Sequence, residues 1–77
     1  MIKPTTRQHE ILDYIRSYIA HNGYSPAHSD INKHFNWTSA NASKSHIDAL
    51  AKKGLLTYAP NVARSIKLIE NKSIKVN

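Results

Sequence analysis

A polar segment in the middle of the chain carries residue types that can read DNA bases. Asn41 offers a donor and an acceptor that match the N6 and N7 edge of adenine. Lys44 can donate to guanine N7 and O6 or to a phosphate, and Ser39 and Ser45 can bond to bases or phosphate oxygens. The small Ala42 permits close approach and contact with a thymine methyl. This set predicts a base-reading surface.

Helical periodicity predicts the element that positions these residues. A helix is expected from Ser39, a favourable N-cap, to Lys53, with Gly54 as the residue that ends it. One side of this helix is apolar or small: Ala40, Ser43, Ile47, Leu50 and Ala51. Ile47, Leu50 and Ala51 form the stripe that should pack on the first helix. The opposite side should face outward: Asn41, Ala42, Ser45, Ala49 and Lys52.

Two helices are predicted upstream. Thr5 and Gln8 form a capping-box pattern that opens a helix over residues 6–22, and Gly23 follows it. The apolar stripe of that helix consists of Ile11, Leu12, Ile15 and Ile19.

The second helix is expected over residues 26–35, with Ser25 as its N-cap and Pro26 in its first position. Asn36 suits a left-handed turn, and Trp37 is a large apolar anchor.

The segment after Gly54 predicts a β-hairpin. Residues 55–58 and 65–69 read as strands around a turn at 59–63, with Ile66 and Leu68 on one face and Lys67 on the other. The expected fold is therefore mainly α with a small β-hairpin, a three-helix winged helix-turn-helix. We expect one domain over residues 1–70 and a flexible basic tail over 71–77.

Positive charge is concentrated in the second half of the chain. The 77 residues carry a net charge of +6, and residues 31–67 alone carry +5 while residues 1–30 are neutral. This excess indicates either a surface that binds a polyanion or one that only keeps the protein soluble. We assign contacts with the DNA backbone to Ser25, His28, Lys52, Lys53 and Arg64, and to the wing at 59–65. Complementing the helix dipole is the alternative role for Lys52 and Lys53.

Catalytic chemistry is not expected. The five histidines show no metal-ligand spacing, and a serine next to His46 on a helix would point away from it. We therefore expect no catalytic residue, metal site, cofactor or small-molecule substrate. No long apolar run or leader pattern is present, so we expect a cytoplasmic protein without membrane contact.

The chain resembles the N-terminal DNA-binding domain of LexA repressors over residues 3–69. The resemblance rests on Thr5-x-Arg7-Gln8-x-Glu10, Ile15-Arg16, Gly23-x-x-Pro26, Ile31, Ser39-x-Asn41-Ala42, His46, Ala49-Leu50-Ala51-x-Lys53-Gly54 and Arg64-x-Ile66-x-Leu68. It implies a repressor fold in which the start of the third helix reads the major groove. It also places Ser39, Asn41 and Ala42 at base-contacting positions of the family.

Three departures from the family distinguish this chain. Positions 44 and 45 are typically acidic in the enterobacterial protein and are Lys44 and Ser45 here, which argues against an identical operator. The glycines expected in the wing are replaced by Asn61 and Ser65, which leaves the wing conformation open. The chain ends shortly after the wing, so we expect no self-cleaving domain and interpret it as a phage, prophage or plasmid regulator or an isolated domain.

These features predict a sequence-specific regulator that binds double-stranded DNA and acts as a repressor, reading the major groove with residues 39–53. Homodimerisation on a palindromic operator stays open. A winged-helix module that binds another regulator or a polymerase subunit is the alternative, and binding of DNA without sequence preference is a third possibility.

Overall fold

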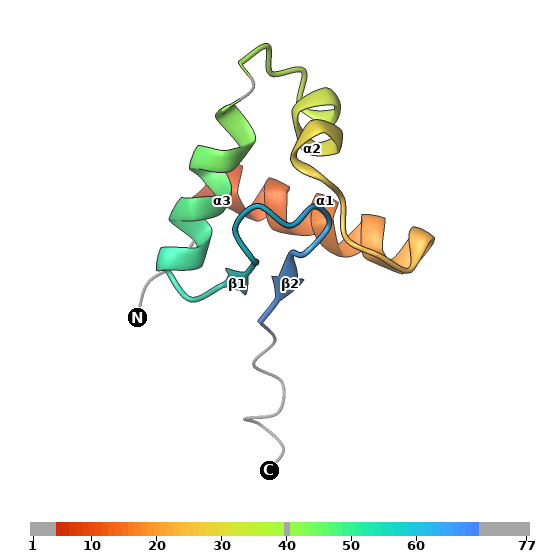
Figure 1. Cartoon of the computed structure of the whole chain (residues 1–77). Coiled ribbons are helices and arrows are strands. Elements are labelled where there is room, and N and C mark those ends of the chain that lie inside the picture. The colour runs from red at the N-terminus through yellow and green to blue at the C-terminus, as the bar shows by residue number, and fades with distance from the viewer. Residues whose placement is uncertain (1–4, 40, 70–77) are drawn as a thin grey trace.

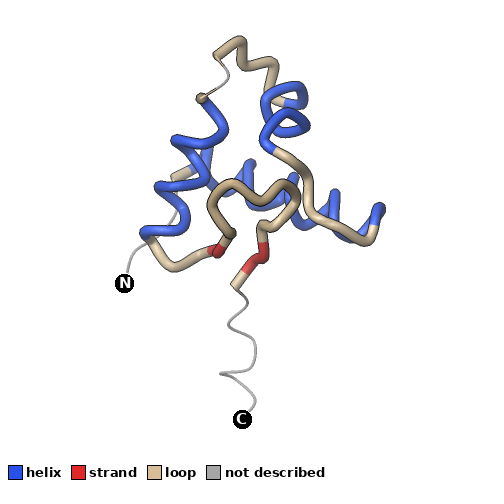
Figure 2. Tube along the Cα trace, viewed as in Figure 1, coloured by secondary structure: helices blue, strands red, loops and turns tan. Residues whose placement is uncertain are grey.

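The fold consists of three helices followed by a two-stranded hairpin, as expected for a winged helix-turn-helix (Figures 1 and 2). The computed structural model describes residues 5–39 and 41–69. The elements are α1 (Thr6–Asn22), α2 (His28–His34), α3 (Ala42–Lys52), β1 (Leu56–Thr57) and β2 (Lys67–Leu68). The domain boundary at residue 70 and the predicted tail at 71–77 lie outside the described residues.

The predicted bounds and caps of α1 are confirmed. The Thr5 side chain accepts a hydrogen bond from the Gln8 backbone, and the Gln8 side chain accepts one from the Thr5 backbone. Gly23 takes a left-handed φ of 80°, and its N–H bonds to the carbonyl of Ile19. Local sequence thus specifies both ends of this helix.

One apolar core joins the helices to the hairpin. Ile47 and Leu50 of α3 are fully buried, together with Ser43, and Ala51 is half-buried, as predicted for the inner side; Ala40 lies outside the described residues. The buried hydrophobic residues are Ile11, Leu12, Ile15, Ile31, Ile47, Leu50, Leu56 and Ile66. In Figure 1, α3 and the β1–β2 loop lie in front of α1, and α2 lies above it.

The predicted start of α2 is wrong by two residues. The helix begins at His28, and the Asp30 carboxylate accepts the N–H of Ala27 at 2.9 Å as the cap. Ser25 does not cap a helix because its buried hydroxyl donates to the Pro26 carbonyl and accepts the N–H of Ile66. Ser25 and Pro26 therefore form a packed link beneath the hairpin.

The predicted start of α3 at Ser39 is also wrong. The helix begins at Ala42, while the Ser39 hydroxyl accepts the Asn41 N–H within the preceding turn. The Asn32 side chain of α2 accepts the Ser43 N–H at 3.1 Å, so a neighbouring helix satisfies a free donor at this end. The helix ends at Lys52, one residue before the predicted end, and Gly54 adopts the left-handed conformation expected of it, with φ of 77°.

The hairpin strands are shorter than predicted. Leu56 pairs with Leu68 and Thr57 with Lys67 in an antiparallel register. The expected alternation holds, because Ile66 is buried and Leu68 half-buried while Lys67 is exposed. At the wing end the ladder stops because the Ile66 N–H bonds to Ser25 and the Ala59 N–H to Ser65, whereas at the other end the Ile69 N–H still bonds to the Leu55 carbonyl.

Candidate nucleic-acid interface

The five predicted base-reading residues gather at one end of α3. Ser39, Asn41, Lys44 and Ser45 are exposed, and Ala42 is half-buried. The backbone N–H groups of Asn41 and Ala42 bond to Ser39, and that of Ser43 bonds to Asn32, so this end contributes the partial positive charge of the helix dipole. Hydrogen-bonding side chains and helix dipole thus share one small surface. Such a surface can present polar groups to base edges and to phosphates.

The turn before α3 is held by stacked aromatic rings. Asn36 adopts the left-handed conformation predicted for it, with φ of 60°. Trp37 stacks between Phe35 and His46, with ring centroids 4.9 Å and 4.6 Å away. Trp37 is therefore the anchor that its size suggested. His46 is its partner on α3, which the sequence had not revealed. The stack sets where Ser39 and Asn41 stand relative to α3.

Lys44 belongs to a network that extends to the hairpin. Its ammonium lies 3.7 Å from the Asp48 carboxylate, one turn further along α3. The Tyr58 hydroxyl, just after β1, donates to the same carboxylate. This hydrogen bond is the main cause that lowers the pKa of Asp48 and raises the pKa of Tyr58. Sequence reasoning missed Asp48 and Tyr58, although the four-residue spacing of Lys44 and Asp48 was a usable signal.

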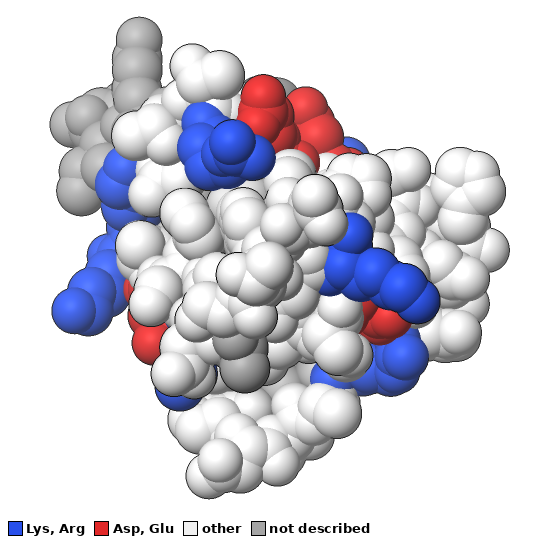
Figure 3. All heavy atoms as spheres, turned by 90° about the horizontal axis from the view of Figure 1, so that it is seen from above, with Lys and Arg blue, Asp and Glu red and all other residues white. Residues whose placement is uncertain are grey.

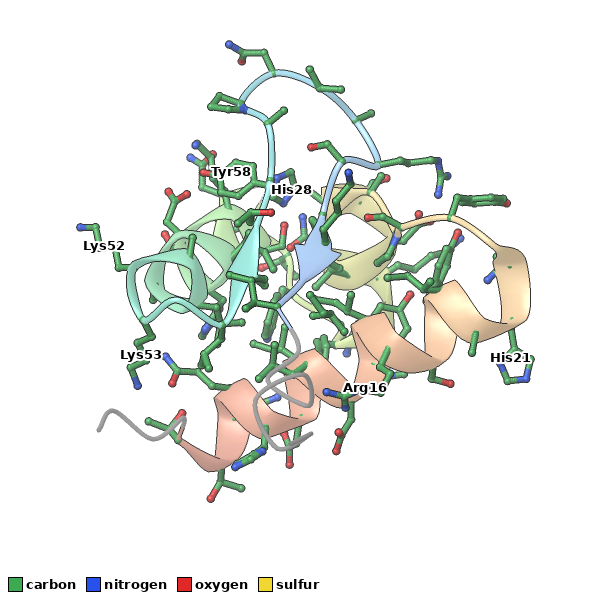
Figure 4. The ribbon with its side chains drawn as sticks, turned by 90° about the horizontal axis from the view of Figure 1, so that it is seen from below. Arg16, His21, His28, Lys52, Lys53 and Tyr58 are labelled. Atoms are coloured by element: carbon green, nitrogen blue, oxygen red, sulfur yellow. The ribbon has the colours of Figure 1, made fainter. Side chains whose placement is uncertain are left out.

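His28 lies beside this network at the start of α2 (Figure 4). Its Nδ1 is 3.1 Å from the Ser43 hydroxyl, and its ring meets the Tyr58 ring edge-on at 6.3 Å. Burial is the main cause that lowers the pKa of His28. The charge of Lys44 lowers this pKa further, and the charge of Asp48 raises it. A depression of about 200 Å³ lies between His28, Lys44 and Tyr58 on one side and the wing residues 59–63 on the other.

The wing has a defined conformation without glycine. Asn61 adopts a left-handed φ of 64°, which asparagine tolerates better than most residues, and Arg64 adopts φ of 57°. The Ser65 hydroxyl closes the loop by accepting the Ala59 N–H and bonding to the carbonyls of Ala59 and Val62. These bonds close the wing loop, whose residues 60–63 are exposed.

Arg64 joins the wing to the first two helices. Its Nη1 lies 3.1 Å from the Asp30 carboxylate, 3.0 Å from the Tyr18 hydroxyl and 3.2 Å from the Ser25 carbonyl. Its guanidinium also lies 5.0 Å from the centre of the Tyr24 ring. The hydrogen bond with Tyr18 is the main cause that raises the pKa of Arg64. The visible role of Arg64 is therefore to position the wing.

The remaining predicted residues lie apart from the start of α3. Lys52 is exposed and Lys53 half-buried at the far end of that helix (Figure 4). Lys52 is the last of the eleven residues of α3 and lies about 16 Å from Asn41 along the helix axis. The Lys53 ammonium donates to the Gln8 side chain at 2.6 Å, which ties α3 to the start of α1. The side chain of Ser25 is buried, and its hydroxyl donates to the Pro26 carbonyl and accepts the Ile66 N–H.

The face seen from above has a centre largely without Lys, Arg, Asp or Glu, and charged side chains of both signs lie around it (Figure 3). Within residues 5–39 and 41–69, no group of three His, Cys, Asp or Glu side chains is placed to hold a metal ion. No helix in the same ranges is long and apolar enough to cross a membrane.

Comparisons with known proteins agree with this geometry. The family profile of the LexA DNA binding domain matches residues 1–65. The LexA repressor of Saccharophagus degradans is 44% identical over 70 residues, covering 91% of this chain and 35% of that protein. The LexA repressors of Thermosipho melanesiensis and Thermosipho africanus are 47% and 50% identical, covering 91% and 86% of this chain. The chain thus spans about a third of the length of these relatives.

Proposed function

Because this chain belongs to the LexA DNA-binding domain family, we propose that it binds double-stranded DNA with sequence specificity and represses transcription. One observation carries the proposal: five polar or small residues suited to base contacts lie together at the exposed start of α3. A module of this size reaches one half-site. Two copies on a palindromic operator are therefore part of the proposal, with residues 1–70 as the DNA-binding unit.

Base reading is assigned to the first turns of α3. In the proposed complex Asn41 pairs with adenine, and Lys44 donates to guanine or to a phosphate beside it. Ser39 and Ser45 supply further hydrogen bonds, and Ala42 allows the helix to approach the groove closely. Lys44 and Ser45 stand where the enterobacterial relatives are typically acidic. These two residues are therefore expected to give the protein its own operator preference.

Contacts with the DNA backbone are assigned to the depression between α2, α3 and the wing. His28 and Lys44 line it, and the wing residues 59–63 form its other wall. A phosphate seated there would meet two nitrogen-bearing side chains beside the base-reading surface. Lys52 adds charge at a greater distance. Lys53 and Arg64 act mainly through the protein, because they hold α1 and the wing in place.

Removing the Asn41 side chain tests the assignment of base reading. Asn41→Ala is expected to weaken binding to the cognate duplex about tenfold, close to 1.4 kcal/mol, and to leave binding to a random duplex nearly unchanged. The physical reason is that a pair of hydrogen bonds to adenine is lost while the phosphate contacts remain. Fluorescence anisotropy with a duplex selected from a random pool measures both affinities at one salt concentration.

A matched substitution controls for the loss of an asparagine. Asn22→Ala removes an exposed asparagine at the C-terminal end of α1 and should leave both affinities unchanged. Equal losses of cognate and random binding in Asn41→Ala would contradict sequence readout by this residue. They would favour DNA binding without sequence preference.

The proposed phosphate contact makes DNA affinity depend on pH through His28. The lowered pKa keeps the free histidine neutral near pH 7, and a phosphate in the depression would favour the protonated form. Affinity is therefore expected to rise as the pH falls from 7.5 to 5.5, by a few-fold more in the native protein than in His28→Gln.

A substitution of another histidine, His21, serves as the control for this prediction. His21→Gln, at the exposed end of α1, should retain the pH dependence of the native protein. Anisotropy titrations at constant ionic strength measure the effect. An identical pH dependence in His28→Gln and the native protein would remove His28 from the interface.

A further inference from the structure

A second concave surface lies away from the start of α3, between α1 and β2. This groove has a volume of about 480 Å³. None of the five base-reading residues lines it. Its walls include Arg16, Ile19, Tyr24, Arg64, Lys67 and Leu68.

The groove combines an apolar floor with a cationic rim. Ile19 and Leu68 are half-buried, and the Tyr24 side chain is 50% exposed. Arg16, Arg64 and Lys67 line the groove, and no Asp or Glu is among its lining residues in the described chain. Arg64 is paired with Asp30 behind the groove, so Arg16 and Lys67 are the cations that a ligand would meet. Arg16 forms an exposed ion pair with Asp13, and such a pair contributes little to stability. Arg16 can therefore exchange the Asp13 carboxylate for a carboxylate of a ligand. The groove therefore complements a chain that is both acidic and apolar.

One wall of the groove is the free edge of β2. The Ile69 N–H bonds to the Leu55 carbonyl across the hairpin, so the backbone groups of Lys67 and Ile69 face β1. Along a strand the backbone groups of successive residues point to opposite edges. The Ile66 N–H accordingly points away from β1 and bonds to the Ser25 hydroxyl. Leu68 must therefore turn its N–H and carbonyl toward the groove. Among the described residues, β1 is the only strand that pairs with β2.

We propose that an extended segment of a partner protein, with Asp or Glu alternating with apolar residues, docks in this groove as a strand added to β2. Its backbone pairs with Leu68, its apolar side chains cover Ile19 and Tyr24, and its carboxylates meet Arg16 and Lys67. Strand addition at an exposed sheet edge is a common mode of peptide recognition. A DNA strand fits the surface less well because phosphates gain nothing from the apolar floor.

Titration with synthetic peptides tests this proposal. A short peptide that alternates Glu with Leu or Val is added to the ¹⁵N-labelled protein, and amide shifts are followed. The expected result is saturable shifts at Leu68, Lys67 and Ile19, with unchanged amides at Asn41 and Ser45. Methylating the peptide's backbone nitrogens should abolish binding, because strand addition needs those donors.

Charge reversal makes the test specific. Arg16→Glu combined with Lys67→Glu should weaken binding of the acidic peptide about tenfold, as expected for two exposed ion pairs. The same variant should gain binding of a peptide with Lys in place of Glu, a result that only a folded groove can give. Lys33→Glu with Lys52→Glu changes the net charge equally outside the groove, and should bind the acidic peptide like the native protein.

Three outcomes would overturn the proposal. One is the absence of saturable shifts at the β2 residues. Another is equal weakening by the two double variants, which would reveal attraction by net charge alone. The third is displacement of the peptide by duplex DNA, which would place the groove in the DNA interface.

Discussion

Ile47→Ala is expected to lower the free energy of unfolding by about 2–5 kcal/mol. Ile47 is fully buried on α3, within the single apolar core that α1, α2 and the hairpin share. The substitution removes buried methyl and methylene groups and leaves a cavity that the surrounding helices fill only in part. A domain of 77 residues has about 4–12 kcal/mol of stability in total, so the loss is a large fraction of it.

Denaturant unfolding followed by circular dichroism measures this loss. Ile69→Ala is the matched control, because the Ile69 side chain is 42% exposed and its removal should cost well under half as much. DNA affinity at low temperature should stay close to native for molecules that remain folded, since Ile47 is turned away from the base-reading surface. A loss below 1 kcal/mol would mean that α3 is not packed on the core as described.

Asp30→Ala is expected to cost about 2–3 kcal/mol, from loss of a helix cap and of hydrogen bonds to a charged group. The Asp30 carboxylate accepts the Ala27 N–H at the start of α2, the Tyr18 hydroxyl of α1, and the Arg64 guanidinium of the wing. One side chain therefore joins three parts of the fold. Its removal should release the wing as well as destabilise α2.

The same carboxylate makes stability depend on pH. The Ala27 N–H is the main cause that lowers the pKa of Asp30 below its ordinary 3.8, and Arg64 and Tyr18 lower it further. Because the folded pKa is below the unfolded one, this stabilisation is present above about pH 4 and is lost as the pH falls through the folded pKa. Asp30→Ala should accordingly lose less of its stability between pH 5 and pH 3 than the native protein.

Asp13→Ala is the matched control for Asp30. Asp13 lies on α1 with a side chain that is 74% exposed, and it pairs only weakly with Arg16. Its removal should change stability by less than about 1 kcal/mol. Thermal unfolding of both variants at pH 7 and pH 3 provides the comparison. Equal stabilities of the two variants at pH 7 would show that the contacts of Asp30 do not hold the wing.

Local patterns were sufficient for much of this fold. The capping box at Thr5, the apolar stripe that begins at Ile11 and the left-handed residues Gly23 and Gly54 each act within one or two helical turns. Their outcome depends little on the rest of the chain, and the structure confirms them. The same holds for the buried side of α3 and for the alternation of Ile66 and Lys67.

The starts of α2 and α3 could not be read in this way. Ser25 and Ser39 have the right residue type for an N-cap, but neither caps a helix. The Ser25 hydroxyl accepts the Ile66 N–H instead, and the Ser39 hydroxyl accepts the Asn41 N–H in the turn before α3. Asn32, eleven residues before Ser43, satisfies the donor at the start of α3. A pattern over four residues does not contain that information, because the partner is brought in by packing of α2 against α3.

For the candidate site, too, part was predictable from local sequence and part depended on tertiary packing. The residue types that could read bases were visible in the sequence, and periodicity placed Asn41, Ala42 and Ser45 on the outward side of the expected helix, although α3 begins only at Ala42. Only the tertiary structure decided what surrounds them: Tyr58 and Asp48 beside Lys44, and Arg64 reaching Tyr18 across 46 positions of the chain. Helix geometry is local, whereas burial and charge pairing depend on which distant segments the core brings together.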